Sequence, residues 1–149
     1  MSRVSPLEAH LGYWLRYVSN QVSSAFGQKV DAAGASVAEW VILRELFDGE
    51  LAPSVLAGRM GMTRGGVSKL ADRLEARGLI LRAESGGDRR YQQLSLTAKG
   101  RALVPKLAAL ADQNDAEFFG HLTDGERERI ERAMRAIVKR MNLKSVPVK

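Results

Sequence analysis

Apolar residues recur every three or four positions in several stretches of the chain, a spacing typical of amphipathic helices. The longest stretch covers residues 7–26, and others cover residues 37–46, 103–119 and 130–141. Each stretch gives a helix one apolar face, so the pattern predicts a mainly helical protein.

Three of these helices are preceded by a capping-box pattern, in which a hydroxyl residue is followed three positions later by glutamate. We expect the first helix to begin after Ser5, with Pro6 in its first turn, and to continue unbroken to near Gly34. Trp14 lies on the apolar stripe of this helix and is expected in the core. The three capping boxes are Ser5–Glu8, Ser36–Glu39 and Thr123–Glu126.

The middle of the chain predicts two shorter helices joined by a tight turn. Residues 53–60 form the first, and the turn falls at Gly61. Thr63 caps the second helix, which ends at Gly78, where a left-handed C-cap is favoured. A short helix, a turn and a second helix with a polar outer face make a helix-turn-helix. The residues of the second helix expected to face the core are Val67, Leu70, Ala71 and Leu74.

Two short strands are expected next, over residues 79–84 and 91–96. The loop between them, residues 85–90, is glycine-rich and carries two arginines at its tip, as in a hairpin wing. The predicted fold is therefore mainly α with a small β-hairpin wing, which together make a winged helix-turn-helix.

The 149 residues amount to a single domain. Residues 36–100 form its winged helix-turn-helix. The flanking helices, residues 1–34 and 101–149, have long apolar stripes that so thin a winged region cannot cover. We therefore expect them to be dimerisation helices in a homodimer.

Composition excludes several classes of protein. The chain has no cysteine, so it has neither disulfides nor thiolate metal sites. Its two histidines, His10 and His121, have no clustered partners, and no metal site or cofactor is expected. No motif of an enzyme stands out. No apolar run is long enough to span a membrane and no signal peptide is visible, so we expect a cytoplasmic protein.

The basic charge gathers in the middle third, where residues 52–100 contain nine basic and four acidic residues. A basic segment is the electrostatic footprint of a polyanion partner. A solvated basic surface is the alternative, and charge alone does not decide between them. The outer face of the second short helix favours double-stranded DNA as the partner. It offers cations for phosphates or guanine edges and hydroxyls for bases or phosphates: Arg64, Lys69, Arg73, Thr63 and Ser68.

Gly65 and Gly66 are unusual at the start of a helix, because each costs about 1 kcal/mol relative to alanine. Close approach of the backbone to DNA would compensate at this first turn. A loosely ordered helix start that tightens on binding is the alternative.

The wing carries Asp88, Arg89 and Arg90. An arginine on a thin loop suits the narrow, electronegative minor groove beside the major groove that the helix enters. A solvated turn is the alternative for an isolated arginine pair, but the position directly after a recognition-type helix favours DNA contact.

At this point the sequence resembles the MarR-type winged helix-turn-helix regulators. Residues 86–90 followed by residues 96–100 match that family's D-x-R-x(5)-L-T-x-x-G signature, and residues 67–80 look like its recognition helix running into the wing. The order of elements agrees over nearly the whole chain. The glycine pair at 65 and 66 departs from the bulkier residues common there, which bears on base specificity.

The resemblance implies a homodimer held by the terminal helices, bound to a pseudo-palindromic operator. It also implies release by a small, often phenolic, ligand. By the same likeness Asp88 would orient an arginine in the wing, and Arg90 would enter the minor groove.

Aromatic residues suggest where such a ligand binds. Tyr13 and Tyr17 lie one turn apart on the first helix, and Trp40 lies on the second. A small aromatic acid could stack on these rings, with its carboxylate on Arg16 or Arg44. Aromatic packing at a dimer or domain junction is the alternative explanation.

The sequence therefore favours a dimeric, sequence-specific transcription regulator, with a repressor released by an aromatic ligand as the leading hypothesis. One alternative is an architectural DNA-binding protein with little sequence preference and no ligand. Another is a helical adaptor that has lost DNA binding, which the basic residues of the helix and wing argue against.

Overall fold

The computed structural model describes residues 3–85 and 88–144, and at residues 84, 85 and 88–91 it describes the backbone alone. A short 3₁₀ turn, η1 (Leu7–Ala9), precedes the first long helix. The elements that follow are α1 (Leu11–Ala32), α2 (Val37–Phe47), α3 (Pro53–Met60), α4 (Arg64–Ala76), β1 (Ile80–Ser85), β2 (Asp88–Leu96), α5 (Ala98–Phe119) and α6 (Asp124–Arg140).

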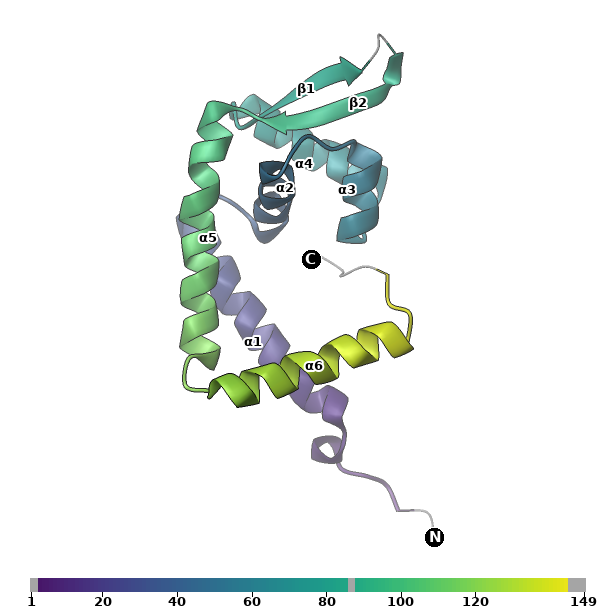
Figure 1. Ribbon diagram of the computed structural model, residues 1–149, viewed down its shortest axis with the longest axis vertical. Coiled ribbons are helices and arrows are strands. Elements are labelled where there is room, and N and C mark those ends of the chain that lie inside the picture. The colour runs from purple at the N-terminus through teal and green to yellow at the C-terminus, as the bar shows by residue number, and fades with distance from the viewer. Residues whose placement is uncertain (1–2, 86–87, 145–149) are drawn as a thin grey trace.

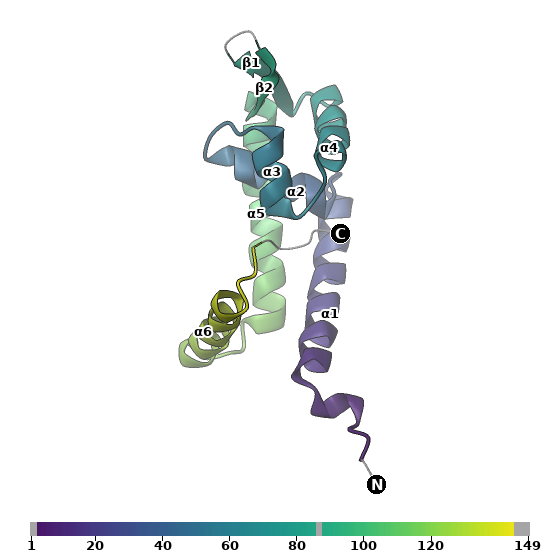
Figure 2. The same cartoon turned by 90° about the vertical axis from the view of Figure 1, so that its right-hand side faces the viewer.

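The short elements form one compact group at one end of the molecule, and two long helices extend from it (Figure 1). Helices α2, α3 and α4 lie beneath the β1–β2 hairpin. Helices α1 and α5 run side by side away from this group, and α6 turns off from the far end of α5 (Figure 2). The mainly helical fold with a hairpin wing is thus confirmed.

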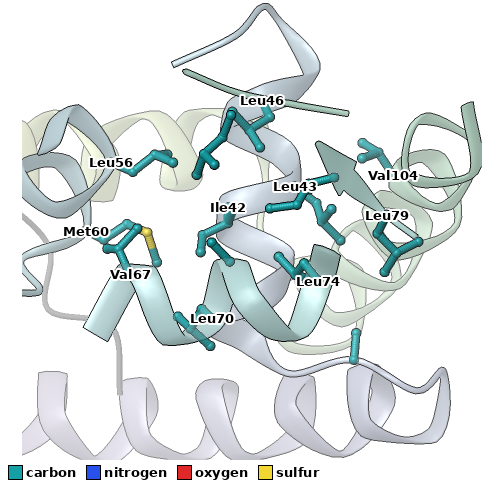
Figure 3. Close-up of a cluster of buried hydrophobic side chains, with 14 of the residues drawn as sticks. Ile42, Leu43, Leu46, Leu56, Met60, Val67, Leu70, Leu74, Leu79 and Val104 are labelled. Carbon is teal, nitrogen blue, oxygen red and sulfur yellow. The ribbon is translucent and has the colours of Figure 1, made fainter. Parts of the chain in front are cut away.

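The buried core lies inside the compact group (Figure 3). Ile42, Leu43 and Leu46 of α2 are fully enclosed and pack between the other short elements and the start of α5. The inward face predicted for the helix after Thr63 is confirmed, since each of its four residues is buried. The remaining large members of the core are Val30, Leu56, Met60, Val67, Leu70, Leu74, Leu79, Ile80, Leu94, Val104 and Leu107.

Two of the three predicted capping boxes form in the structure. Both reciprocal bonds of the capping box form at Ser36 and at Thr123. The box predicted at Ser5 is wrong: the chain makes only a 3₁₀ turn there, capped by Pro6 with no side-chain bond. His10 then takes an extended conformation, and α1 begins at Leu11. The physical reason is that residues 3–12 are all exposed in the described structure, so burial of an apolar face does not stabilise a longer helix there.

Trp14 is likewise not in the core, because its side chain is 49% exposed. Its indole N–H donates to the Glu8 carbonyl oxygen at 2.9 Å, which holds the 3₁₀ turn against the start of α1. The N-terminal half of α1 extends beyond the compact group, so within one chain its apolar stripe stays uncovered (Figure 2).

Helix α6 also exposes its whole apolar stripe. None of its residues is buried, although its large apolar side chains recur at helical spacing. The exposed members are Ile130, Met134, Ile137, Val138 and Met141. No helix in the described part of the chain is long and apolar enough to cross a membrane.

Hydrogen bonds and an ion pair between polar side chains connect α1 to α5. The Asn114 side-chain amide is buried; it donates to the Val22 carbonyl oxygen at 3.1 Å and accepts from the Lys29 ammonium at 3.0 Å. Lys29 also forms an ion pair with Glu117 at 2.8 Å. Hydrogen bonds from Lys29 and then Gln113 lower the pKa of the Glu117 carboxyl below its ordinary value.

The hairpin differs from the prediction at its tip. The strands pair antiparallel with Ile80 opposite Leu96, and the register shifts between Glu84 and Ser85. Because β2 begins at Asp88, the predicted loop over residues 85–90 is too long, and Arg89 and Arg90 belong to the strand rather than to the loop tip. The pairing of Ser85 with Asp88 carries each strand beyond its predicted limit at this end of the hairpin.

Candidate nucleic-acid interface

The turn between α3 and α4 sets the direction of the second helix. Gly61 has a left-handed backbone, with φ of 65°, and closes α3. Thr63 then caps α4, because its hydroxyl oxygen accepts from the Gly66 backbone N–H at 3.0 Å. Buried Leu56 and Met60 on α3 face Val67 on α4 across the turn (Figure 3). The helix-turn-helix is therefore built as the sequence predicts.

The outer face of α4 is basic. Arg64, Lys69 and Arg73 are exposed, and Ser68 is half-buried. Among residues whose side chains the structure describes, no carboxylate lies within ion-pair distance of these three cations. Uncompensated positive charge on an exposed helix face is what a phosphate-lined groove attracts.

Asp72, the acidic residue on this face, is engaged by the wing. One Arg82 guanidinium nitrogen donates to the Asp72 carboxylate at 2.5 Å and to the Ser68 carbonyl oxygen at 3.1 Å. The Arg82 Nε lies 4.0 Å from the Glu75 carboxylate. Arg82 thus ties strand β1 to the middle of α4, so the wing and the helix are held at one angle.

Sequence analysis missed Arg82, although a signal was present. Side chains two positions apart on a strand point to the same side. Ile80 is buried against the core, so Arg82 must face α4 as well. A charged residue at an inward position of a strand calls for a partner, and Asp72 is that partner.

The L-T-x-x-G part of the signature fastens α5 to the end of α4. The Thr97 hydroxyl donates to the Gly78 carbonyl oxygen at 2.6 Å and accepts from the Gly100 N–H at 3.0 Å. The Lys99 ammonium donates to the Arg77 carbonyl oxygen at 2.9 Å. A Cβ atom at position 100 would lie 2.1 Å from the Leu79 carbonyl oxygen, so only glycine fits.

The two glycines at the start of α4 are not equivalent. A Cβ atom on Gly66 would come within 3.1 Å of the Met62 methyl group and 3.2 Å of the Thr63 hydroxyl. A Cβ atom on Gly65 would meet nothing closer than that hydroxyl, at 4.0 Å. Crowding in the cap thus accounts for Gly66, whereas nothing within the described chain requires glycine at position 65.

The wing residues Asp88, Arg89 and Arg90 lie in β2 by their backbone. Their side chains fall outside the described part of the structure. Their contacts with DNA stay a prediction.

The residues expected to line a ligand pocket fall into two groups within one chain. Tyr13 and Tyr17 stack edge-on at the N-terminal end of α1, with ring centroids 6.1 Å apart, and Arg16 is exposed between them. Trp40 instead packs edge-on against Phe26, with centroids 6.5 Å apart. Phe26 lies nine residues beyond Tyr17 on α1, about 13 Å along the helix axis.

Arg44 lies one turn after Trp40 on α2, so it belongs to the same group as Trp40. Its guanidinium pairs with Asp48 at 3.0 Å and lies over the Phe47 ring. A single chain therefore does not bring the five residues into one pocket.

Comparison with known proteins gives the family. A model described as the MarR family matches residues 33–90. The regulator PapX of Escherichia coli is 30% identical over 117 residues, which cover 76% of this chain and 69% of PapX. The chain belongs to the MarR family. The resemblance seen in the signature is thereby confirmed, and the class of protein is a DNA-binding transcription regulator, not an enzyme.

Two further likenesses cover more of the molecule. The transcriptional regulator PrsX of Escherichia coli is 28% identical over 130 residues, covering 85% of this MarR-family chain and 78% of PrsX. The solved structure of BpsR from Bordetella bronchiseptica, a protein whose DNA binding is regulated by 6-hydroxynicotinic acid, superposes with a TM-score of 0.79 at 26% identity. That match covers 91% of this chain and 97% of BpsR.

Proposed function

We propose that this regulator is a homodimer that binds a pseudo-palindromic operator and represses transcription from it. The observation that carries the proposal is the uncompensated basic face of α4, held at a fixed angle to the wing by Arg82 and Asp72. Residues 36–100 would contact DNA in the cytoplasm. Each chain would form a single domain, and its residues 1–34 and 101–149 would hold the two protomers together.

In this arrangement α4 enters the major groove. Arg64 and Arg73 are the candidates for guanine contacts, while Lys69, Thr63 and Ser68 are placed for phosphates or further base contacts. Gly65 lets the backbone of the first turn approach the DNA. The wing residues Asp88, Arg89 and Arg90 serve the neighbouring minor groove.

An architectural protein with little sequence preference is the second candidate, and a competition experiment separates the two. Fragments of the source genome bound by the protein would be selected, and the best one titrated against unrelated duplex. A specific regulator should prefer its operator by about 10³-fold or more. Affinity should also fall steeply with salt, with a log–log slope of about −5 to −9 if a dimer neutralises roughly 6–10 phosphates. Equal affinity for both duplexes would favour the architectural function.

We further propose that a small aromatic acid releases the operator. The support is the regulation of BpsR by 6-hydroxynicotinic acid, together with Trp40, Phe26 and Arg44 at the α1–α2 junction. Tyr13, Arg16 and Tyr17 would complete the pocket only across the dimer. Such a ligand must favour the arrangement that does not bind DNA, since equal affinity for both shifts nothing.

The test is an operator titration with and without salicylate-like acids. We expect Trp40→Ala and Arg44→Ala to blunt the response and to leave the ligand-free DNA affinity nearly unchanged. If a broad panel of aromatic acids leaves the wild-type affinity unchanged, these aromatic residues serve packing alone.

A further inference from the structure

A basic depression lies where α1, α4 and α5 meet, at the C-terminal end of α4. Its volume is about 280 Å³. Its floor is apolar and three cationic side chains surround it, while none of the described residues lining it carries a carboxylate. The lining residues are Ala33, Leu79, Ala102, Leu103, Arg77, Lys99 and Lys106.

Each of the three cations has N–H groups that form no hydrogen bond with another described residue. Arg77 donates to the Glu39 carboxylate at 3.1 Å and to the Gly34 carbonyl oxygen at 2.6 Å, which uses two of its five N–H groups. Lys99 uses one of its three on the Arg77 carbonyl oxygen. Lys106 donates to no partner among the described residues. An anion can therefore be bound without breaking the contacts that hold this corner.

We propose that this depression is a binding site for a small organic phosphate, a phosphomonoester on a compact apolar body. A phosphomonoester carries a charge of about −1.5 to −2 at neutral pH and three acceptor oxygens. This matches the two positive charges that remain on the three cations once Arg77 is paired with Glu39. A monocarboxylate would leave one of those two charges without a counter-charge. The apolar floor contacts the organic part, and the volume admits a molecule of about ten non-hydrogen atoms.

The site is connected directly to the C-terminal end of α4, the proposed recognition helix. Arg77 is the residue that caps the C-terminal end of α4, and its side chain fixes that end to the turn after α1. Lys99 fixes it to the start of α5. An anion shared by Arg77, Lys99 and Lys106 biases how α4 sits on the flanking helices. The effect on DNA rests on the proposed function, whereas the binding itself does not.

Binding is tested by calorimetry with phenyl phosphate, benzoate and phenol at about 0.15 M salt. Lys106→Gln is the informative variant because it removes no contact within the described chain, and Lys139→Gln at the end of α6 is the control with the same change in charge. We expect phenyl phosphate to bind wild type and Lys139→Gln equally, and Lys106→Gln about three- to tenfold more weakly. Benzoate should bind at least about tenfold more weakly than phenyl phosphate, and phenol not at all.

Three results overturn the proposal. One is no saturable binding of phenyl phosphate up to about 10 mM. Another is equal affinity of Lys106→Gln and Lys139→Gln. The third is benzoate binding as tightly as phenyl phosphate, which would exclude the phosphate class.

Operator titration separates this site from the DNA interface. Phenyl phosphate should change operator affinity by the same factor by which operator changes phenyl phosphate affinity. Without the probe, Lys106→Gln should bind operator as wild type does. If it weakens DNA binding as much as Lys69→Gln, the depression holds a DNA phosphate and the proposal fails. If phenyl phosphate binds but no duplex is preferred, the proposed function fails and the site stands.

Discussion

At the scale of single residues, Gly100 and Gly65 differ in what a side chain at each position would approach. Gly100 approaches the backbone of its own chain, at the Leu79 carbonyl oxygen. Gly65 approaches nothing within the described chain, although glycine weakens the helix it begins. The proposed approach of the α4 backbone to DNA would account for glycine at position 65.

We expect Gly100→Ala to destabilise the protein by about 1–3 kcal/mol, because a Cβ atom there overlaps backbone rather than a flexible side chain. The measurement is urea unfolding followed by circular dichroism. Gly58→Ala is the matched control: it also lies in a helix of the compact group, and a Cβ atom there has no neighbour within 4 Å. A Gly100→Ala protein as stable as wild type would mean that α5 can shift away from Leu79 at little cost.

Gly65→Ala should have opposite effects on stability and on DNA binding. Replacing glycine in the first turn of α4 should raise the free energy of unfolding by up to about 1 kcal/mol. The added methyl group should weaken operator binding if the backbone contacts DNA there. Gly27→Ala in α1 controls for helix propensity alone, since its Cβ would have only an ordinary contact with Val37 at 4.0 Å. Unchanged DNA affinity in Gly65→Ala would place the DNA farther from this turn.

At the scale of elements, the wing and α4 act as one unit through Arg82. Replacing Arg82 by Met keeps an apolar stem and removes the bonds to Asp72 and Ser68. We expect operator affinity to fall up to about tenfold. The double variant Arg82→Met/Asp72→Asn should lose less affinity than the sum of the losses of Arg82→Met and Asp72→Asn alone. Electrophoretic or anisotropy titrations on folded protein measure this. Arg101→Met is the control, because Arg101 packs over Phe47 away from the α4–β1 contact. Fully additive losses would show that Arg82 and Asp72 act separately.

The elements of the compact group were predictable because local signals and burial agree there. Gly61, Thr63 and Gly78 mark the limits of α3 and α4, and the apolar spacing between them matches the buried face. The break at His10 was not predictable in this way. Ser5 and Glu8 give as good a local capping signal as Ser36 and Glu39, and only the lack of a packing partner distinguishes them.

The candidate site was predicted unevenly for the same reason. Exposed cations on α4 follow directly from helical spacing, so sequence places them well. The pocket residues depend on where two long helices lead, and sequence spacing carries no such information. Tyr17 and Trp40 therefore lie in separate groups in one chain, and the basic corner of Arg77, Lys99 and Lys106 joins residues far apart in sequence.

At the scale of the whole molecule, the uncovered apolar stripes of α1 and α6 are the feature that a single chain leaves unexplained. Exposed apolar patches of this extent mark interaction surfaces. Obligate dimers of this kind typically bury about 2,000 Å² or more. A dimer that reads two half-sites must also place its two α4 helices about 34–36 Å apart, the spacing of successive major grooves.

Ile137→Glu on the apolar stripe of α6 should therefore abolish both dimerisation and tight operator binding. A buried carboxylate without a partner is costly, so the variant should sediment as a monomer at low micromolar concentration, and its operator affinity should fall about 100-fold or more because only one half-site can be held. Ala136→Glu adds the same charge on the opposite face of α6 and should change neither property. A wild-type protein that sediments as a stable monomer at this concentration would contradict the dimer. A dimeric Ile137→Glu protein would instead place the interface on α1.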